Sequence, residues 1–112
     1  MDHRLCQMHA DTCRALSHPK RVEILNRLRD GEKSVGALVD EMGISKSNAS
    51  QHLALLRQVG AVTYRRDGQT LYYRVANPKI IQACDLMKQV LLERLESQEA
   101  LAHGQSPEGE DE

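Results

Sequence analysis

The sequence predicts a mainly α-helical domain with one β-hairpin, and three patterns carry this prediction. Apolar residues recur at helical spacing in five segments of the chain. Capping residues precede several of these segments and glycines follow them. Alternating residues flank an Asp67-Gly68 pair between the fourth and fifth segments, and such a pair is a strong hairpin signal. The expected order is therefore α-α-α-α-β-β-α.

Two helices are expected before residue 31. One side of the first gathers Leu5, Met8, Thr12, Ala15 and Leu16. Ser17-His18-Pro19 begins the second, because proline is favoured at the first helical position. Its buried stripe is expected to be Val22, Leu25 and Leu28, ending at Gly31.

The next two helices are short and closely spaced. Ser34 can cap a helix whose apolar residues are Val35, Leu38, Val39 and Met42, and Gly43 ends it. Ser45 caps the following helix, which Gly60 ends. In this helix the spacing i, i+4, i+7 buries Ala49, Leu53 and Leu56. Two helices joined by a glycine-containing turn form a helix-turn-helix.

Polar residues crowd the first two turns of the second of these helices: Lys46, Ser47, Asn48, Ser50, Gln51 and His52. A recognition helix presents such side chains to base edges and phosphates. An ordinary amphipathic helix with a solvated face would show the same pattern.

The predicted hairpin shifts the balance toward DNA. Val62 and Tyr64 alternate before the turn at residues 66–69, and Leu71, Tyr73 and Val75 alternate after it. Arg65 and Arg66 stand beside the turn, so guanidinium groups could reach a phosphate backbone. A trailing hairpin makes the helix-turn-helix winged. The alternative is a surface hairpin with solvated arginines.

DNA contacts are assigned by side-chain chemistry. Gln51 and Ser47 are expected to read base edges, because amides and hydroxyls hydrogen-bond in the major groove. Phosphates are expected to be held by Lys46, Arg65 and Arg66. The full expected contact set is Lys46, Ser47, Asn48, Ser50, Gln51, His52, Arg57, Arg65, Arg66 and Gln69. His52 could instead be a packed surface histidine.

These motifs resemble the ArsR/SmtB family of small bacterial winged-helix repressors that sense metals and metalloids. The resemblance covers about Leu16–Pro78 and includes residues 15–25, residues 50–57 and the Tyr72-Tyr73 pair of the wing. It implies a homodimer formed through the first and last helices. It also implies binding to double-stranded operator DNA, with release when an inducer binds.

Composition fits one small domain. Residues 1–101 are expected to form the winged-helix DNA-binding and dimerisation domain, and residues 102–112 a disordered acidic tail. The formal net charge is −1 over 112 residues. Without the tail carboxylates Glu108, Glu110, Asp111 and Glu112, 15 basic residues face 12 acidic ones, giving +3. The placement of charge therefore decides the attraction to phosphate.

A last helix is expected from near Pro78 to about Gln98. Its apolar stripe, suited to a dimer seam, is Ile80, Cys84, Met87, Leu91 and Leu95. Cys84 could be a small buried hydrophobe there.

Three cysteines, Cys6, Cys13 and Cys84, suggest an effector site, with His9 beside the first two. Three thiolates suit As(III), Sb(III) or another thiophilic metal ion, and no cofactor is obligatory. Cys6 and Cys13 are separated by about 10.5 Å along an unbroken helix, so both can bind one ion only if the N-terminal turn frays. The alternative is a redox or reactive-sulfur sensor in which Cys13 and Cys84 are oxidised to a disulfide or a sulfur-bridged form.

Other functional classes are disfavoured. The chain has no Cys-x-x-Cys, no glycine-rich phosphate loop, and no nucleophile paired with a base, so an enzyme is not expected. It has no signal-peptide pattern and no apolar run near 18 residues, so we expect a cytoplasmic protein without membrane contact. A non-catalytic protein-interaction module stays open as an alternative; it would show no salt-dependent binding to duplex DNA.

Overall fold

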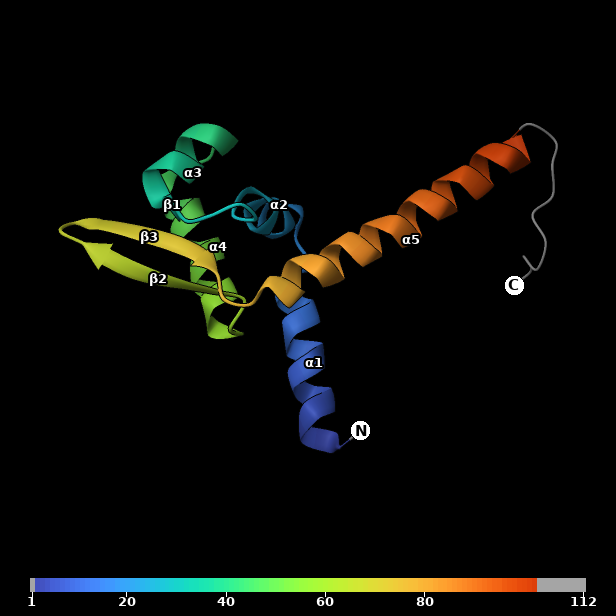
Figure 1. Ribbon diagram of the computed structural model, residues 1–112, viewed down its shortest axis with the longest axis horizontal. Helices are drawn as coiled ribbons and strands as arrows, with labels where there is room; N and C mark the ends of the chain where they lie inside the picture. The colour runs from blue at the N-terminus through green and yellow to red at the C-terminus, as the bar shows by residue number, and fades with distance from the viewer. Residues whose placement is uncertain (1, 103–112) are drawn as a thin grey trace. The chain divides into compact units, whose positions relative to one another are not determined.

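The computed structural model describes residues 2–102, and its elements follow the predicted order with one addition (Figure 1). In chain order they are α1 (His3–Ala15), α2 (Pro19–Arg27), β1 (Lys33–Ser34), α3 (Val35–Met42), α4 (Lys46–Gln58), β2 (Val62–Asp67), β3 (Thr70–Val75) and α5 (Pro78–Ala102). Strand β1 was not expected. Ala102 ends α5, and the rest of the predicted acidic tail lies outside the described residues.

Serine side chains cap the N-terminal ends of α3 and α4, as predicted. The Ser34 hydroxyl accepts the backbone N–H of Ala37 at 3.0 Å, and the Ser45 hydroxyl accepts that of Asn48 at 3.0 Å. Gly43 follows α3 with φ +65°, a left-handed conformation that favours glycine. The helix-turn-helix therefore consists of α3, a three-residue turn and α4.

The chain divides into two compact units whose boundary falls between Ile81 and Gln82. The first unit has an aliphatic core to which α2, α3 and α4 each contribute. Its largest fully buried side chains are Ile24, Leu25, Leu28, Leu38, Leu53 and Leu56. Helix α4 packs against α2, α3 and β2.

The predicted stripe of α2 is wrong at one position. Leu25 and Leu28 are buried, but Val22 is 43% exposed, and Ile24 fills the core in its place. Ile24, Leu25 and Leu28 follow the i, i+1, i+4 spacing of one helix face, whereas Val22 lies about 160° around the helix from Ile24. Helix α2 also ends at Arg27, before the expected stop at Gly31.

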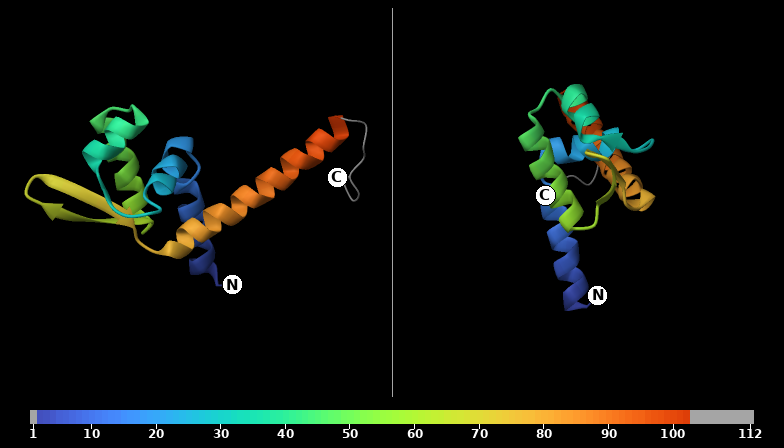
Figure 2. Two further views of the ribbon diagram at one scale, coloured as in Figure 1. Left: turned by 45° about the horizontal axis from the view of Figure 1, so that its top comes forward. Right: turned by 90° about the vertical axis from the view of Figure 1, so that its left-hand side faces the viewer.

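The sheet is antiparallel with strand order β1-β3-β2. Hairpin β2–β3 projects beyond the helices of its unit (Figures 1 and 2). Its two loop residues are Gly68 and Gln69, with Gly68 at φ +63°. A positive φ at the first loop residue alone matches a type II′ hairpin turn. Asp67, expected in the turn, pairs with Thr70 at the end of the strands.

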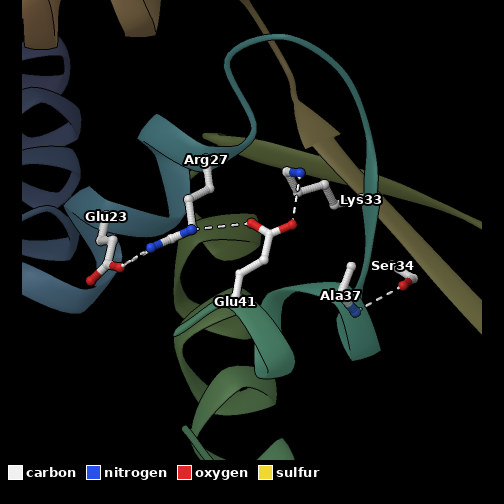
Figure 3. A network of polar contacts seen from close by, with 6 residues as sticks. All are labelled: Glu23, Arg27, Lys33, Ser34, Ala37 and Glu41. Carbon is white, nitrogen blue, oxygen red and sulfur yellow. Dashed lines mark hydrogen bonds and ion pairs between the residues drawn. The ribbon is translucent and has the colours of Figure 1, made fainter. Parts of the chain in front are cut away.

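Around Glu41 a network of ion pairs connects α2, α3 and β1 (Figure 3). The carboxylate of Glu41 lies 3.2 Å from Arg27 Nη1 and 2.9 Å from Lys33 Nζ. Arg27 also pairs with Glu23 at 2.9 Å within α2. The hydrogen bonds from Lys33 and Arg27 lower the pKa of Glu41 below its usual value of 4.5.

From Gln82 onward the described chain is the remainder of α5. Its large apolar side chains between residues 86 and 95 are 46–62% exposed: Leu86, Met87, Val90, Leu91, Leu92 and Leu95. This exposed apolar surface is wider than the predicted stripe, because Leu86, Val90 and Leu92 add to it. Cys84 and Ile80 are half-buried. Within residues 2–102, none of the helices combines the length and the apolar character that a membrane span requires.

We predict that Glu41→Gln lowers the free energy of unfolding at pH 7, since the neutral amide loses two ion pairs. Because folding lowers the pKa of Glu41, its contribution is present above about pH 4.5 and is lost as the pH falls through the lower folded pKa. The difference between wild type and variant should therefore narrow below about pH 4.5. Urea unfolding followed by circular dichroism from pH 7 to pH 3.5 measures it.

Asp40→Asn is the matched control, because Asp40 makes no side-chain hydrogen bond or ion pair within residues 2–102. It should leave the stability nearly unchanged at every pH. If Glu41→Gln lowers the free energy of unfolding by the same amount from pH 7 to pH 3.5, the charge of the carboxylate has no role.

Candidate nucleic-acid interface

Helix α4 is held in one rotational setting by its buried stripe. Ala49, Leu53 and Leu56 are all 0% exposed, as the i, i+4, i+7 spacing predicts. Rotation of the helix would bring polar side chains into an aliphatic core, which is unfavourable without hydrogen-bond partners. The outward face of α4 is therefore set by the packing beneath it.

That outward face carries the predicted DNA contacts. Five of them are exposed: Lys46, Ser47, Asn48, Ser50 and Gln51. Ser47 and Gln51, four residues apart, lie on the side opposite the core, one turn above the other. None of these five side chains hydrogen-bonds to another residue within 2–102, so their donors and acceptors are available to a ligand. This arrangement matches an unliganded recognition helix.

His52 lies on the flank of α4 that faces α2. Its ring is half-buried, 4.7 Å from the ring of His18, and its Nδ1 lies 3.4 Å from Arg21 Nη1. Desolvation and the nearby positive charge of His18, Arg21 and Lys20 lower the pKa of His52 below 6.5. The expected DNA contact at His52 is thus placed against α2, consistent with the packed alternative.

On the opposite flank, α4 meets the wing. Arg57 lies over the ring of Tyr64, with its guanidinium carbon 4.9 Å from the centroid, and Tyr64 packs on Tyr73 at 5.3 Å. Because Tyr73 is buried, this face of the hairpin is the one that packs on the core. Arg57, expected at DNA, therefore also joins α4 to the wing.

Arg65 and Arg66 point to opposite faces of the hairpin, because side chains alternate along a strand. Arg66 pairs with Leu71 and shares the face of Tyr64. It is exposed and makes no ion pair within the described part of the chain. Arg65 lies on the other face and pairs with Glu32 at 2.6 Å. Gln69 is exposed in the loop.

Two of the predicted metal ligands, Cys6 and Cys13, are held apart by α1. Helix α1 is unbroken from His3 to Ala15, so Cys6 and Cys13 stay about 10.5 Å apart along it. Both are exposed, and Cys84 is half-buried on α5. Residues 2–102 contain no group of three His, Cys, Asp or Glu side chains placed to hold a metal ion. An unbroken α1 therefore cannot bring the thiols of Cys6 and Cys13 to the same ion.

Comparison with known proteins identifies the family. Residues 18–64 match the family described as bacterial regulatory protein, arsR family. The HTH-type transcriptional regulator Rv0081 of Mycobacterium tuberculosis is 38% identical over 88 residues, covering 78% of this chain and 77% of that protein. This chain belongs to the ArsR family of transcriptional regulators. The family assignment and the winged helix-turn-helix fold are thereby confirmed, and the class is that of transcriptional regulators, as predicted, rather than enzymes.

Solved structures of relatives agree. The crystal structure of Rv0081 superposes with a TM-score of 0.78 at 35% identity, covering 87% of this chain and 98% of that one. A homodimeric winged helix-turn-helix domain, Mb0332 of Mycobacterium bovis, gives 0.77 at 32% identity, covering 86% and 92%. HlyU of Vibrio cholerae, described as a transcriptional activator, is 36% identical over 66% of this chain and 68% of its own length. One structure of HlyU is described as the reduced protein; it gives a TM-score of 0.69 at 31% identity, covering 78% of this chain and 92% of that one.

Several residues around the interface escaped sequence reasoning. Glu32, Tyr72, His18 and Arg21 touch the predicted contact residues but lie up to 34 positions away in the chain. No local pattern marks them, since each contact depends on how distant segments pack.

We predict that Arg66→Ala weakens binding to every duplex and lowers the slope of log affinity against log salt by about 0.9 for each protomer bound, the value for one phosphate contact. Fluorescence anisotropy with an operator duplex and an unrelated duplex at four salt concentrations measures both quantities. Arg4→Ala removes a charge from the first turn of α1 and should leave the slope unchanged. If Arg66→Ala keeps the wild-type affinity and slope, the wing does not contact phosphate.

Proposed function

We propose that this protein is a transcriptional repressor that binds double-stranded operator DNA through α4 and the wing. The observation that carries the proposal is the exposed polar face of α4 above a fully buried stripe. Gln51 and Ser47 read base edges, and Lys46 and Arg66 contact phosphates. Salt-dependent binding to the protein's own promoter in a gel shift tests it. Absence of such binding at any salt concentration would favour a protein-interaction module.

The repressor acts as a homodimer. An exposed apolar surface this large on one helix is typical of an interface. A second copy of the chain is the natural partner, because a homodimeric relative shares the fold and two-fold symmetry repeats the recognition helix on a palindromic site. Leu5 and Met8 of α1 are also exposed and extend the apolar surface available to a partner.

We predict that Leu91→Glu disrupts the dimer, since an unpaired charge in an apolar seam is unfavourable. Gln89→Glu adds the same charge about 160° around the helix from position 91 and should not disturb assembly. Sedimentation velocity at micromolar concentration measures both variants. A monomeric wild type, or a fully dimeric Leu91→Glu variant, would show that α5 is not the seam.

Release from DNA depends on thiols outside the helix-turn-helix. Cys13, exposed on α1, and Cys84 on α5 are the principal donors. Cys6 joins them only if the first turn of α1 unwinds, since the intact helix keeps it about 10.5 Å from Cys13. Soft sulfur donors suit arsenite, antimonite or another thiophilic ion. Binding would shift the two halves of the dimer and misalign the recognition helices.

A redox mechanism is the second candidate, and the relative whose structure is described as reduced favours it. Here the thiols of Cys13 and Cys84 form a disulfide and give two electrons and two protons to a peroxide, which is reduced to two waters or, for an organic hydroperoxide, to one water and one alcohol. Exposure of Cys13 allows the oxidant to reach it.

Serine variants distinguish these candidates. We predict that Cys6→Ser, Cys13→Ser and Cys84→Ser, combined, retain operator binding but lose release by arsenite or antimonite. A gel shift on the protein's promoter with arsenite, antimonite, cadmium, zinc, peroxide and polysulfide measures this. Equal release of wild type and triple variant by arsenite rules out the thiol site. If only oxidants or polysulfide release the wild type, the redox mechanism replaces the metalloid one.

A further inference from the structure

Arg65 is held by a carboxylate and an aromatic ring. Its Nη2 donates to Glu32 Oε1 at 2.6 Å, and its Nε donates to both carboxylate oxygens at 3.1 Å. Its guanidinium carbon lies 4.5 Å from the centre of the Tyr72 ring. We call Glu32, Arg65 and Tyr72 the wing clamp.

The wing clamp spans the sheet. Tyr72 lies on the central strand β3, opposite Ser34 of β1 on one side and Arg65 of β2 on the other. Glu32 immediately precedes β1. The ion pair therefore connects the outer strand β2 to the segment before β1 across the face opposite the core. On the core face, Arg57 over Tyr64 connects the same strand to α4.

The geometry argues against Arg65 as a phosphate ligand. A guanidinium grips an oxyanion most effectively through two parallel N–H bonds, and Glu32 occupies the Nε and Nη2 edge of Arg65 in this way. The hydrogen bond from Arg65 lowers the pKa of Glu32, so the carboxylate stays ionised at neutral pH. The pair offers DNA no net charge. Arg66, on the opposite face, has no acidic partner within residues 2–102.

We propose that Glu32 and Arg65 are positioning residues that fix the wing so that Arg66 reaches a DNA phosphate. The inference rests on the proposed DNA-binding function and replaces the expected phosphate contact at Arg65. The clamp acts through fork geometry and the aromatic face rather than through charge.

Glu32→Gln separates the two roles of Arg65. If the clamp positions Arg66, the variant binds operator DNA about tenfold more weakly for each protomer bound, the change expected for one lost charge-assisted contact. If Glu32 merely masked a phosphate ligand, the variant would bind more tightly with a steeper salt slope. Asp67→Asn is the matched control, because it removes one exposed carboxylate from the same hairpin and leaves every hydrogen bond of the clamp in place. It should bind at least as tightly as wild type.

Two further variants complete the test by anisotropy at several salt concentrations. In the Arg66→Ala background, Glu32→Gln should cause no additional loss, because the contact it positions is already absent. Arg65→Lys should weaken binding about as much as Glu32→Gln, since lysine keeps the charge but lacks the planar fork. Thermal unfolding confirms that each variant is folded at the assay temperature.

The inference is overturned if Glu32→Gln binds as tightly as wild type, if its effect adds fully to that of Arg66→Ala, or if Arg65→Lys binds like wild type. These results differ from failure of the proposed function, in which the wild type itself shows no salt-dependent duplex binding.

Discussion

The burial of Ala49, Leu53 and Leu56 is the constraint on which the interface depends. At 0% exposure these side chains leave α4 a single rotational setting, and every polar residue of the helix takes its place from that setting. Ser47 and Gln51 face outward, His52 turns toward α2, and the opposite flank meets the wing. Recognition chemistry is thus a consequence of core packing, because the same helix supplies both.

Three consecutive residues then fix what surrounds α4. Glu32 binds Arg65 of the wing. Lys33 binds Glu41 near the end of α3, and Ser34 caps the start of α3 (Figure 3). Since Glu41 also binds Arg27 of α2, this segment ties the wing, α3 and α2 together. Each contact is modest because the groups are partly exposed. Their shared location makes the orientation of the wing and that of the helix-turn-helix interdependent.

Sequence patterns predicted the features that local chemistry controls. The serine caps at 34 and 45 and the glycine after α3 lie where expected, and the buried stripe of α4 follows its periodicity. Strand β1 could not be predicted, because two residues carry no period and form a strand only by pairing with β3. The partner of Arg65 was equally inaccessible, since Glu32 lies 33 residues away. The predicted hairpin put both Arg65 and Arg66 near the turn but could not show that only one of them is paired.

The distribution of ion pairs also explains how a chain of formal charge −1 can attract DNA. Several basic residues are neutralised by a carboxylate, within α1 for Arg14 and between separate segments for Arg27, Lys33 and Arg65. Those at the start of α2, on α4 and on the core face of the wing have no ion pair within residues 2–102: Lys20, Arg21, Lys46, Arg57 and Arg66. Because an ion pair cancels most of the field beyond it, the unpaired residues dominate the potential around α4. Whether a lysine or arginine attracts DNA therefore depends on whether a carboxylate pairs with it, because the residue types are the same in both groups.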